Sequence, residues 1–256
     1  MRRIQNWLAL VVIGGGVAVA GVLGFLTYLA TTAETLHPDA NTVSSVASSP
    51  SSPEWASAVE EAQRAVRASL AEQNLPGVSV AVGADGGLVW AEGFGWADLE
   101  SRQAITPGTR FRIGTASEVL TSAAVGLLME QGRLDLDAPI QTYVPEFPQK
   151  PWPVTLRHLM GHVAGVRTDG GDEGPFAEHC DQTIEGLRIF ADRSLLFEPG
   201  TRFRYSSYGW ILVSAAVERA AEEPFLRFVR RKIFEPLGMD DTKADSATDP
   251  ALLQAQ

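Results

Sequence analysis

Only one pair of segments after residue 53 has the character of β-strands, and this restricts the fold more than any other feature. The apolar runs 78–82 and 88–94 are short and are joined by the turn-forming sequence Asp85-Gly86-Gly87, which predicts a hairpin. Helical patterns precede and follow these runs, so the chain is predicted to have an α+β fold. Because an isolated hairpin is marginal in water, something must complete its sheet.

The helices are predicted from apolar periodicity and from their end signals. Before the hairpin, apolar residues recur at helical spacing, at Trp55, Val59, Ala62, Val66 and Leu70. That helix is expected to stop at residues 74–77, which read Asn-Leu-Pro-Gly. The segment 119–129 is apolar nearly all round, which predicts a buried helix that Gln131-Gly132 ends. Further helices are predicted over 154–161, 182–192, 208–222 and 225–234.

The first 53 residues differ in composition from the remainder. Residues 8–30 carry no charge, and as a helix they would extend roughly 34 Å, enough to cross a bilayer. We therefore predict a transmembrane anchor over 1–30, with a cleaved secretory signal ending near Ala33 as the alternative. Arg2 and Arg3 precede the apolar run, which favours a cytoplasmic N-terminus and an exported domain, periplasmic or extracellular.

Residues 31–53 are rich in Ser, Thr, Ala and Pro and predict a flexible tether, so that the folded domain would occupy 54–256. The chain has 31 acidic and 21 basic residues, a net charge of −10. An acidic domain of this kind is a poor ligand for nucleic acid. The one cysteine, Cys180, excludes an intrachain disulfide and lies too far along the chain for an N-terminal lipid anchor.

Six phrases, in order, carry a resemblance to a known superfamily. They are Gly77-Val78-Ser79-Val80-Ala81-Val82, Phe111-Arg112-Ile113-Gly114, Leu134-Asp135-Leu136-Asp137-Ala138-Pro139-Ile140, Tyr143-Val144-Pro145-Glu146-Phe147, Pro199-Gly200-Thr201-Arg202-Phe203-Arg204-Tyr205-Ser206 and Pro236-Leu237-Gly238-Met239-Asp240-Asp241-Thr242. With these phrases, residues 54–248 resemble the serine beta-lactamase, penicillin-binding protein and esterase superfamily, its class C-like members in particular. The resemblance implies a beta-lactamase/transpeptidase-like fold.

The resemblance also implies a site whose reactive residues are altered here. The family uses a serine and, one helical turn later, a lysine that takes the serine's proton. These positions are Thr115 and Glu118 in this sequence. The family's tyrosine, which relays protons, is retained as Tyr205, while Ser207 stands where an asparagine would hold the substrate. A late strand with a basic triad would come beyond Gln256, so we expect the fold to be incomplete.

Two interpretations of Thr115 and Glu118 are open. Either Thr115 is a nucleophile assisted by Glu118 and Tyr205, or Thr115 only caps the following helix and Glu118 completes a capping box. The capping interpretation fits the residue types better, because a carboxylate is a weak base. Loss of a nucleophile or its base typically costs on the order of 10⁶ in turnover.

The sequence does not predict a metal site. His158 and His162 would share a face of a helix, and His179 with Cys180 could add ligands, but no glutamate follows His158 as a metalloprotease motif requires. No cofactor motif is present either, since no glycine-rich phosphate loop ends in lysine.

The sequence therefore predicts an exported, membrane-anchored relative of the serine hydrolases with impaired catalysis and a binding or regulatory role. The alternative is a residual hydrolase of beta-lactams, esters or peptides that uses Thr115. A small-molecule or peptidoglycan-like ligand is the expected partner. A second chain that completes the sheet is a further possible partner, because an open sheet edge favours pairing.

Overall fold

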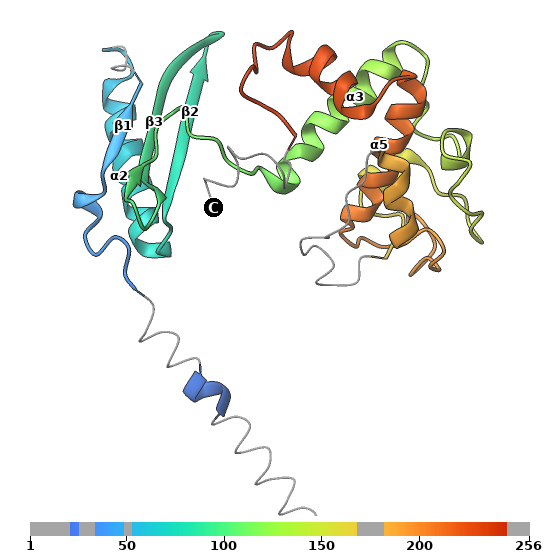
Figure 1. The fold of residues 1–256 in the computed structure, drawn as a ribbon, viewed down its shortest axis with the longest axis horizontal. Helices are drawn as coiled ribbons and strands as arrows, with labels where there is room; N and C mark the ends of the chain where they lie inside the picture. Colours follow the sequence, from blue (N-terminus) through green and yellow to red (C-terminus); the bar gives the residue numbers. More distant parts are fainter. Residues whose placement is uncertain (1–20, 26–33, 49–52, 168–181, 245–256) are drawn as a thin grey trace, which may run out of the picture. The chain divides into compact units, whose positions relative to one another are not determined.

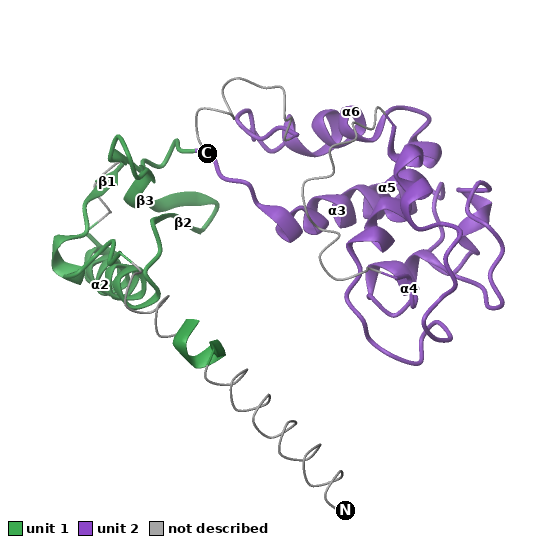
Figure 2. Cartoon of the chain, turned by 60° about the horizontal axis from the view of Figure 1, so that its bottom comes forward, with its two compact units in different colours: residues 1–109, 253–256 green, residues 110–252 purple. Residues whose placement is uncertain are grey.

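The computed structural model describes residues 21–25, 34–48, 53–167 and 182–244, and the chain divides into two compact units (Figure 2). Unit 1 comprises residues 1–109 with 253–256, and unit 2 comprises residues 110–252. The division at residue 109 lies inside the segment 54–256, which we predicted as one domain. Each unit has its own apolar core.

Unit 1 is built from a hairpin and one long helix. Its elements are η1 (Ala40–Thr42), β1 (Ser45–Ala47), α2 (Ala56–Gln73), β2 (Gly77–Ala84), β3 (Gly87–Asp98) and β4 (Gln103–Ala104). The predicted hairpin is confirmed, because β2 and β3 pair in antiparallel register from Gly77 with Gly95 to Ala84 with Gly87. Asp85 and Gly86 both have positive φ at its tip, the conformation that a tight hairpin turn requires.

Two further strands of this sheet come from the same chain. On the edge of β3 away from β2, β1 pairs through Ser45 with Phe94, and β4 pairs through Ala104 with Trp96. The flexible tether is therefore wrong for residues 34–48, where Val43 is buried in the core. Strand β1 is not predicted from the sequence because three residues are too few to show the alternation of a strand.

Helix α2 covers one face of the sheet (Figure 1). Val59 and Leu70 of the helix pack with Trp90 and Phe94 of β3, whose rings meet edge to face at 6.1 Å. Residues 90, 92 and 94 alternate along the strand, so their side chains share the face toward α2. The predicted end of the helix is confirmed at Asn74, which adopts a left-handed conformation.

Unit 2 is mostly helical. Its elements are η2 (Gly114–Ala116), α3 (Ser117–Glu130), η3 (Ile140–Thr142), α4 (Leu156–Met160), η4 (Thr183–Ile189), α5 (Ser207–Ala221), α6 (Phe225–Val229) and η5, a π-helical turn (Arg230–Phe234). Helix α5 lies at the centre and contacts α3, α4, α6 and η4. The helical predictions are confirmed, except that 182–192 forms a 3-10 helix instead of an α-helix.

Helix α3 is buried on one face only, which corrects the prediction of a helix buried all round. Its inward face holds Ala124, Val125 and Leu128, all at most 1% exposed. Val119, in its first turn, is 71% exposed. The apolar residues on the other faces of α3 are not buried, because within the described residues α5 and α6 cover only one side of the helix.

Within the described residues no helix is long and apolar enough to span a membrane. The predicted anchor falls largely outside those residues, and only 21–25 belong to both, where they are helical. The anchor over 1–30 therefore stays a prediction.

Candidate functional site

The site lies at the N-terminal end of α3, where the chain enters the helix through the turn η2. The residue that caps α3 is Ala116, and neither it nor Ile113, which caps η2, makes a side-chain capping hydrogen bond. Instead the backbone amide of Ser117 donates to the carbonyl oxygens of Gly114 and Thr115. The capping interpretation of Thr115 is therefore wrong, because a 3-10 turn already satisfies the amide at this helix start.

The Thr115 side chain is exposed and contacts Tyr205, the tyrosine that the family uses to relay protons. Its hydroxyl lies 3.1 Å from the hydroxyl of Tyr205, and either oxygen can donate. The structure thus brings together two residues that are 90 positions apart in the sequence. Such a pair can pass a proton between its two hydroxyls, the relay that the family assigns to the tyrosine.

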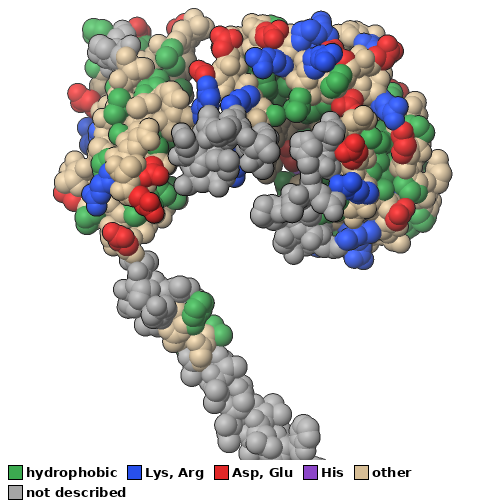
Figure 3. All heavy atoms as spheres, in the orientation of Figure 1, with side chains coloured by type: hydrophobic (Ala, Val, Ile, Leu, Met, Phe, Trp, Pro, Cys, Tyr) green, Lys and Arg blue, Asp and Glu red, His purple; other side chains and the backbone are tan. Residues whose placement is uncertain are grey.

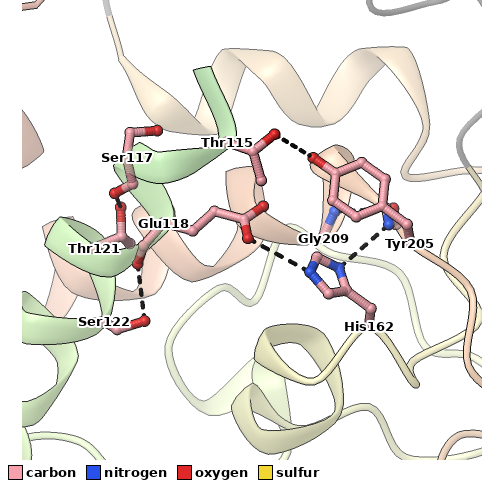
Figure 4. A network of polar contacts seen from close by, with 9 residues as sticks. Thr115, Ser117, Glu118, Thr121, Ser122, His162, Tyr205 and Gly209 are labelled. Carbon is pink, nitrogen blue, oxygen red and sulfur yellow. Dashed lines mark hydrogen bonds and ion pairs between the residues drawn. The ribbon is translucent and has the colours of Figure 1, made fainter. Parts of the chain in front are cut away.

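Glu118 points toward the same place from the first turn of α3, but its partner is a histidine. The Oε2 atom of Glu118 lies 3.5 Å from Nε2 of His162, and the two side chains are 18% and 14% exposed. Thr115, Glu118, His162 and Tyr205 point toward one another (Figure 4). The carboxylate at the family's lysine position is therefore held by an imidazole.

His162 reaches this position because the chain leaves α4 just before it. The helix ends at Met160, and His162 itself has a φ of 55°, a left-handed conformation that costs a non-glycine residue about 1 kcal/mol. The predicted shared helix face of His158 and His162 is therefore wrong. The backbone of His162 is held by a segment far along the chain, because the amide of Arg204 donates to the His162 carbonyl oxygen at 2.9 Å.

The second ring nitrogen of His162 accepts a hydrogen bond. The backbone amide of Ser206 donates to Nδ1 at 3.3 Å, so Nδ1 carries no proton and Nε2 carries the proton that faces Glu118. The ring also packs on Tyr205, with centroids 4.7 Å apart, and on Phe203 at 5.9 Å. Orientation and tautomer of the imidazole are thereby both fixed.

Ser206 holds this arrangement by capping α5. Its side chain is buried and its hydroxyl accepts from the amide of Gly209 at 3.3 Å, as a serine at a helix N-cap does. Tyr205 precedes the cap, and Ser207, the predicted substrate-binding position, is the first residue of the helix. Ser207 is partly exposed.

The described residues contain no group of three or more side chains that could hold a metal ion. Of the histidines and the cysteine that were weighed as ligands, His179 and Cys180 lie outside these residues. Lys150, one of three lysines in the sequence, is engaged elsewhere: its Nζ donates to the carbonyl oxygens of Ala191 and Arg193. Burial lowers the pKa of this amine.

The surface around unit 2 carries both signs of charge. On the face shown in Figure 3, acidic and basic side chains lie side by side over much of the unit. Within unit 2, Arg157 pairs with Asp137 at 2.6 Å. The side chains drawn in colour on that face form no broad acidic surface.

Sequence reasoning brought out Thr115, Glu118 and Tyr205 but missed the role of His162. Nothing local to position 162 signals that its ring turns toward a residue 44 positions earlier. A histidine within an apolar segment was the available signal, and it is ambiguous between a metal ligand, a structural residue and a site residue.

Comparison with known proteins places this geometry in a family. The model of the family described as Beta-lactamase matches residues 62–255. The human serine beta-lactamase-like protein LACTB, mitochondrial, is 32% identical over 254 residues, which cover 72% of this chain and 46% of that protein. Penicillin-binding protein 4* of Bacillus subtilis is 26% identical over 68% of this chain and 39% of its own length.

Solved structures agree with these relatives. The octameric penicillin-binding protein homologue from Pyrococcus abyssi has a TM-score of 0.63 at 29% identity, over 71% of this chain and 43% of that chain. EstCE1, described as a hydrolase with promiscuous acyltransferase activity, has a TM-score of 0.64 at 28% identity, over 73% of this chain and 53% of that chain. The chain spans about half the length of the curated relatives it matches. With its mixed helices and sheet and a matching family model over most of its length, this chain belongs to the beta-lactamase family, in the superfamily of serine beta-lactamases and penicillin-binding proteins.

Proposed function

We propose that this member of the beta-lactamase family binds a ligand at the Thr115–Tyr205 pair and that its hydrolytic chemistry is largely lost. One observation carries the proposal: the position of the general base holds Glu118, whose carboxylate is engaged by His162 at 3.5 Å. In the family's mechanism this position supplies an amine that takes the nucleophile's proton. A binding or regulatory role is what remains when the hydroxyls of Thr115 and Tyr205 still face each other and the base is replaced.

Rate arithmetic supports the loss of turnover. Replacing either the nucleophile or its base in a serine hydrolase lowers kcat by about 10⁶. Here both positions differ from the family, and the methyl group of Thr115 crowds the approach of a carbonyl carbon. Hydroxyls at 3.1 Å and a partly exposed carboxylate still provide hydrogen-bonding groups for a ligand.

A second candidate is a residual hydrolase in which Thr115 is the nucleophile, assisted by Glu118 and Tyr205. The observation that favours it is that Thr115 does not cap α3 but presents an exposed hydroxyl to Tyr205. In this function the Thr115 proton would pass to Tyr205 or Glu118, and the substrate would be a beta-lactam, an ester or a peptide.

Covalent labelling separates the two candidates. The purified chain is exposed to a fluorophosphonate or to a penicillin, and its intact mass is recorded together with that of Thr115→Ala. We expect the wild-type protein to carry no adduct. A cooperative thermal melt of the same sample shows that the protein is folded. Ser117→Ala is the matched control, because it removes another exposed hydroxyl two residues away. A single adduct that Thr115→Ala abolishes and Ser117→Ala retains would establish the hydrolase.

We also propose that the apolar segment 8–30 anchors the protein in a membrane with the folded part exported. The absence of charge over 23 residues and the two preceding arginines support this. Protease treatment of intact cells tests this topology. If the protease digests the folded part only after the cell membrane has been permeabilised, the folded part is not exported.

A further inference from the structure

We infer that the ligand of this site presents a cationic amine to Glu118, an inference that rests on the ligand-binding function proposed above. Three features of the site favour a positive charge: the partners of Glu118, the hydrogen bond that His162 accepts, and the oxygen atoms beside the carboxylate.

Among the described residues, no basic side chain balances the charge of Glu118. Its carboxylate contacts His162 and neither a lysine nor an arginine. With a side chain only 18% exposed, Glu118 also has less water around it than a surface carboxylate has.

His162 does not supply the missing positive charge. A protonated imidazole would carry a proton on both nitrogens, and the proton on Nδ1 would then face the Ser206 amide, itself a donor, at 3.3 Å. A neutral ring fits both neighbours: Nδ1 accepts from the Ser206 amide, and Nε2 lies 3.5 Å from Oε2 of Glu118. Such a ring adds no positive charge beside the carboxylate.

The start of α3 offsets this charge only in part. Glu118 is the second residue of the helix, where the aligned peptide dipoles amount to roughly half a positive charge. This stabilises the carboxylate in the free protein without providing a donor that occupies its oxygens. A cation therefore remains favourable at the carboxylate.

Oxygen atoms and ring faces beside Glu118 match an ammonium group. An alkylammonium has three N–H donors, and the carboxylate and the hydroxyls of Thr115 and Tyr205 are the acceptors that point into this place (Figure 4). The aromatic ring of Tyr205, which packs on His162, belongs to the same group of side chains, and aromatic rings attract cations.

The sign of the selectivity follows from the substitution itself. A lysine at position 118 would attract anionic groups and repel amines, and a glutamate there does the reverse. Discrimination then arises from both terms, attraction of the cation and repulsion of a carboxylate.

Two alanine dipeptide probes of opposite charge test the inference. Alanyl-alanine amide has a free ammonium and no carboxylate, whereas N-acetyl-alanyl-alanine has a carboxylate and no ammonium. Dissociation constants for the full chain are measured by NMR titration of ¹⁵N-labelled protein. We expect the cationic probe to bind about tenfold more tightly, the effect of one charge-assisted contact.

Variants assign the preference to Glu118. Glu118→Gln should bring the two dissociation constants to within about twofold of each other, and Glu118→Lys should reverse their order. Glu130→Gln, at the other end of α3 and exposed, makes the same charge change and should leave the tenfold preference intact.

Two results would overturn the inference, and they are distinguishable. Equal binding of both probes by the wild type, or a preference that survives Glu118→Gln, rejects the cationic ligand and leaves the proposed binding function standing. If neither probe shifts a resonance of the folded protein while Thr115 takes up a covalent label, the binding function fails and the inference fails with it.

Discussion

Two glutamates, one in each unit, show how differently a carboxylate is used in this chain. Glu92 lies on β3 in unit 1 and is 2% exposed; Glu118 lies at the start of α3 in unit 2, with 18% of its side chain exposed. Glu92 accepts from Gln63 Nε2 at 2.7 Å and from Trp90 Nε1 at 2.8 Å, and it pairs with Arg67 at 3.8 Å. Among the described residues, the Glu118 carboxylate contacts only the His162 side chain.

The difference teaches which carboxylate maintains the fold and which remains available to a ligand. Burial alone would raise the pKa of Glu92, but hydrogen bonds from Ser45, Gln63 and Trp90 and the charge of Arg67 outweigh it and lower the pKa. Its acceptor capacity is filled from within unit 1. Glu118 keeps free acceptor capacity, as a binding residue must.

Replacing Glu92 should have the largest effect on stability. Glu92→Gln leaves Arg67 without its counter-charge and places an amide NH2 group where one buried carboxylate oxygen faces Arg67, so we expect a loss of about 2–3 kcal/mol in the free energy of unfolding. Native-state hydrogen exchange of the β3 amides measures this within unit 1. Glu60→Gln, an exposed change on α2, is the control and should alter stability by less than about 0.5 kcal/mol. Equal losses in both variants would mean that Glu92 does not maintain the fold.

A smaller loss is expected when the segment before α2 is loosened. Val43 is 5% exposed and packs with Val59 and Phe94, so Val43→Ala should destabilise unit 1 by about 1.5 kcal/mol. Val46 in β1 is 39% exposed, and Val46→Ala should cost less than half as much. Hydrogen exchange of both variants checks this ranking. If Val43→Ala costs no more than Val46→Ala, residues 34–48 behave as the tether that the composition suggested.

Acid should remove the contribution of Glu92 gradually. Because the folded pKa of Glu92 lies below its ordinary value of 4.5, its stabilisation is fully present above that value and is lost as the pH falls below it, through the folded pKa. Urea unfolding of the wild type and Glu92→Gln at pH 6 and at successively lower pH measures the effect. The stability difference between the two proteins should shrink with acidification, and a constant difference would contradict the assignment.

The smallest effect is expected at Glu118. Glu118→Gln keeps an amide oxygen that can accept from His162, so the free energy of unfolding should change by less than about 0.5–1 kcal/mol. Urea unfolding beside Glu130→Gln provides the measurement. A loss as large as that of Glu92→Gln would show that Glu118 is a structural residue, and the distinction between the two carboxylates would disappear.

Much of the fold could be predicted because its signals are local. The hairpin follows from Asp85-Gly86, which can adopt positive φ, and the end of α2 follows from Asn74 for the same reason. Strand β1 could not be predicted, since three residues carry no period and its stability comes from pairing with β3. The burial of α3 on one face likewise depends on which neighbours cover it.

In the site, too, residue identities could be predicted from the sequence, whereas contacts between residues far apart in the chain could not. The sequence by itself determined the α+β architecture, the family's phrases and the replacement of the serine and lysine positions by Thr115 and Glu118, because residue identity and spacing along one helix start suffice for these. Only the tertiary structure decided that Thr115 bonds to Tyr205 instead of capping α3, and that His162 faces Glu118 with its tautomer fixed by Ser206. These contacts join residues between 44 and 90 positions apart, and a hydroxyl or an imidazole has several possible partners until packing brings one of them within hydrogen-bonding distance.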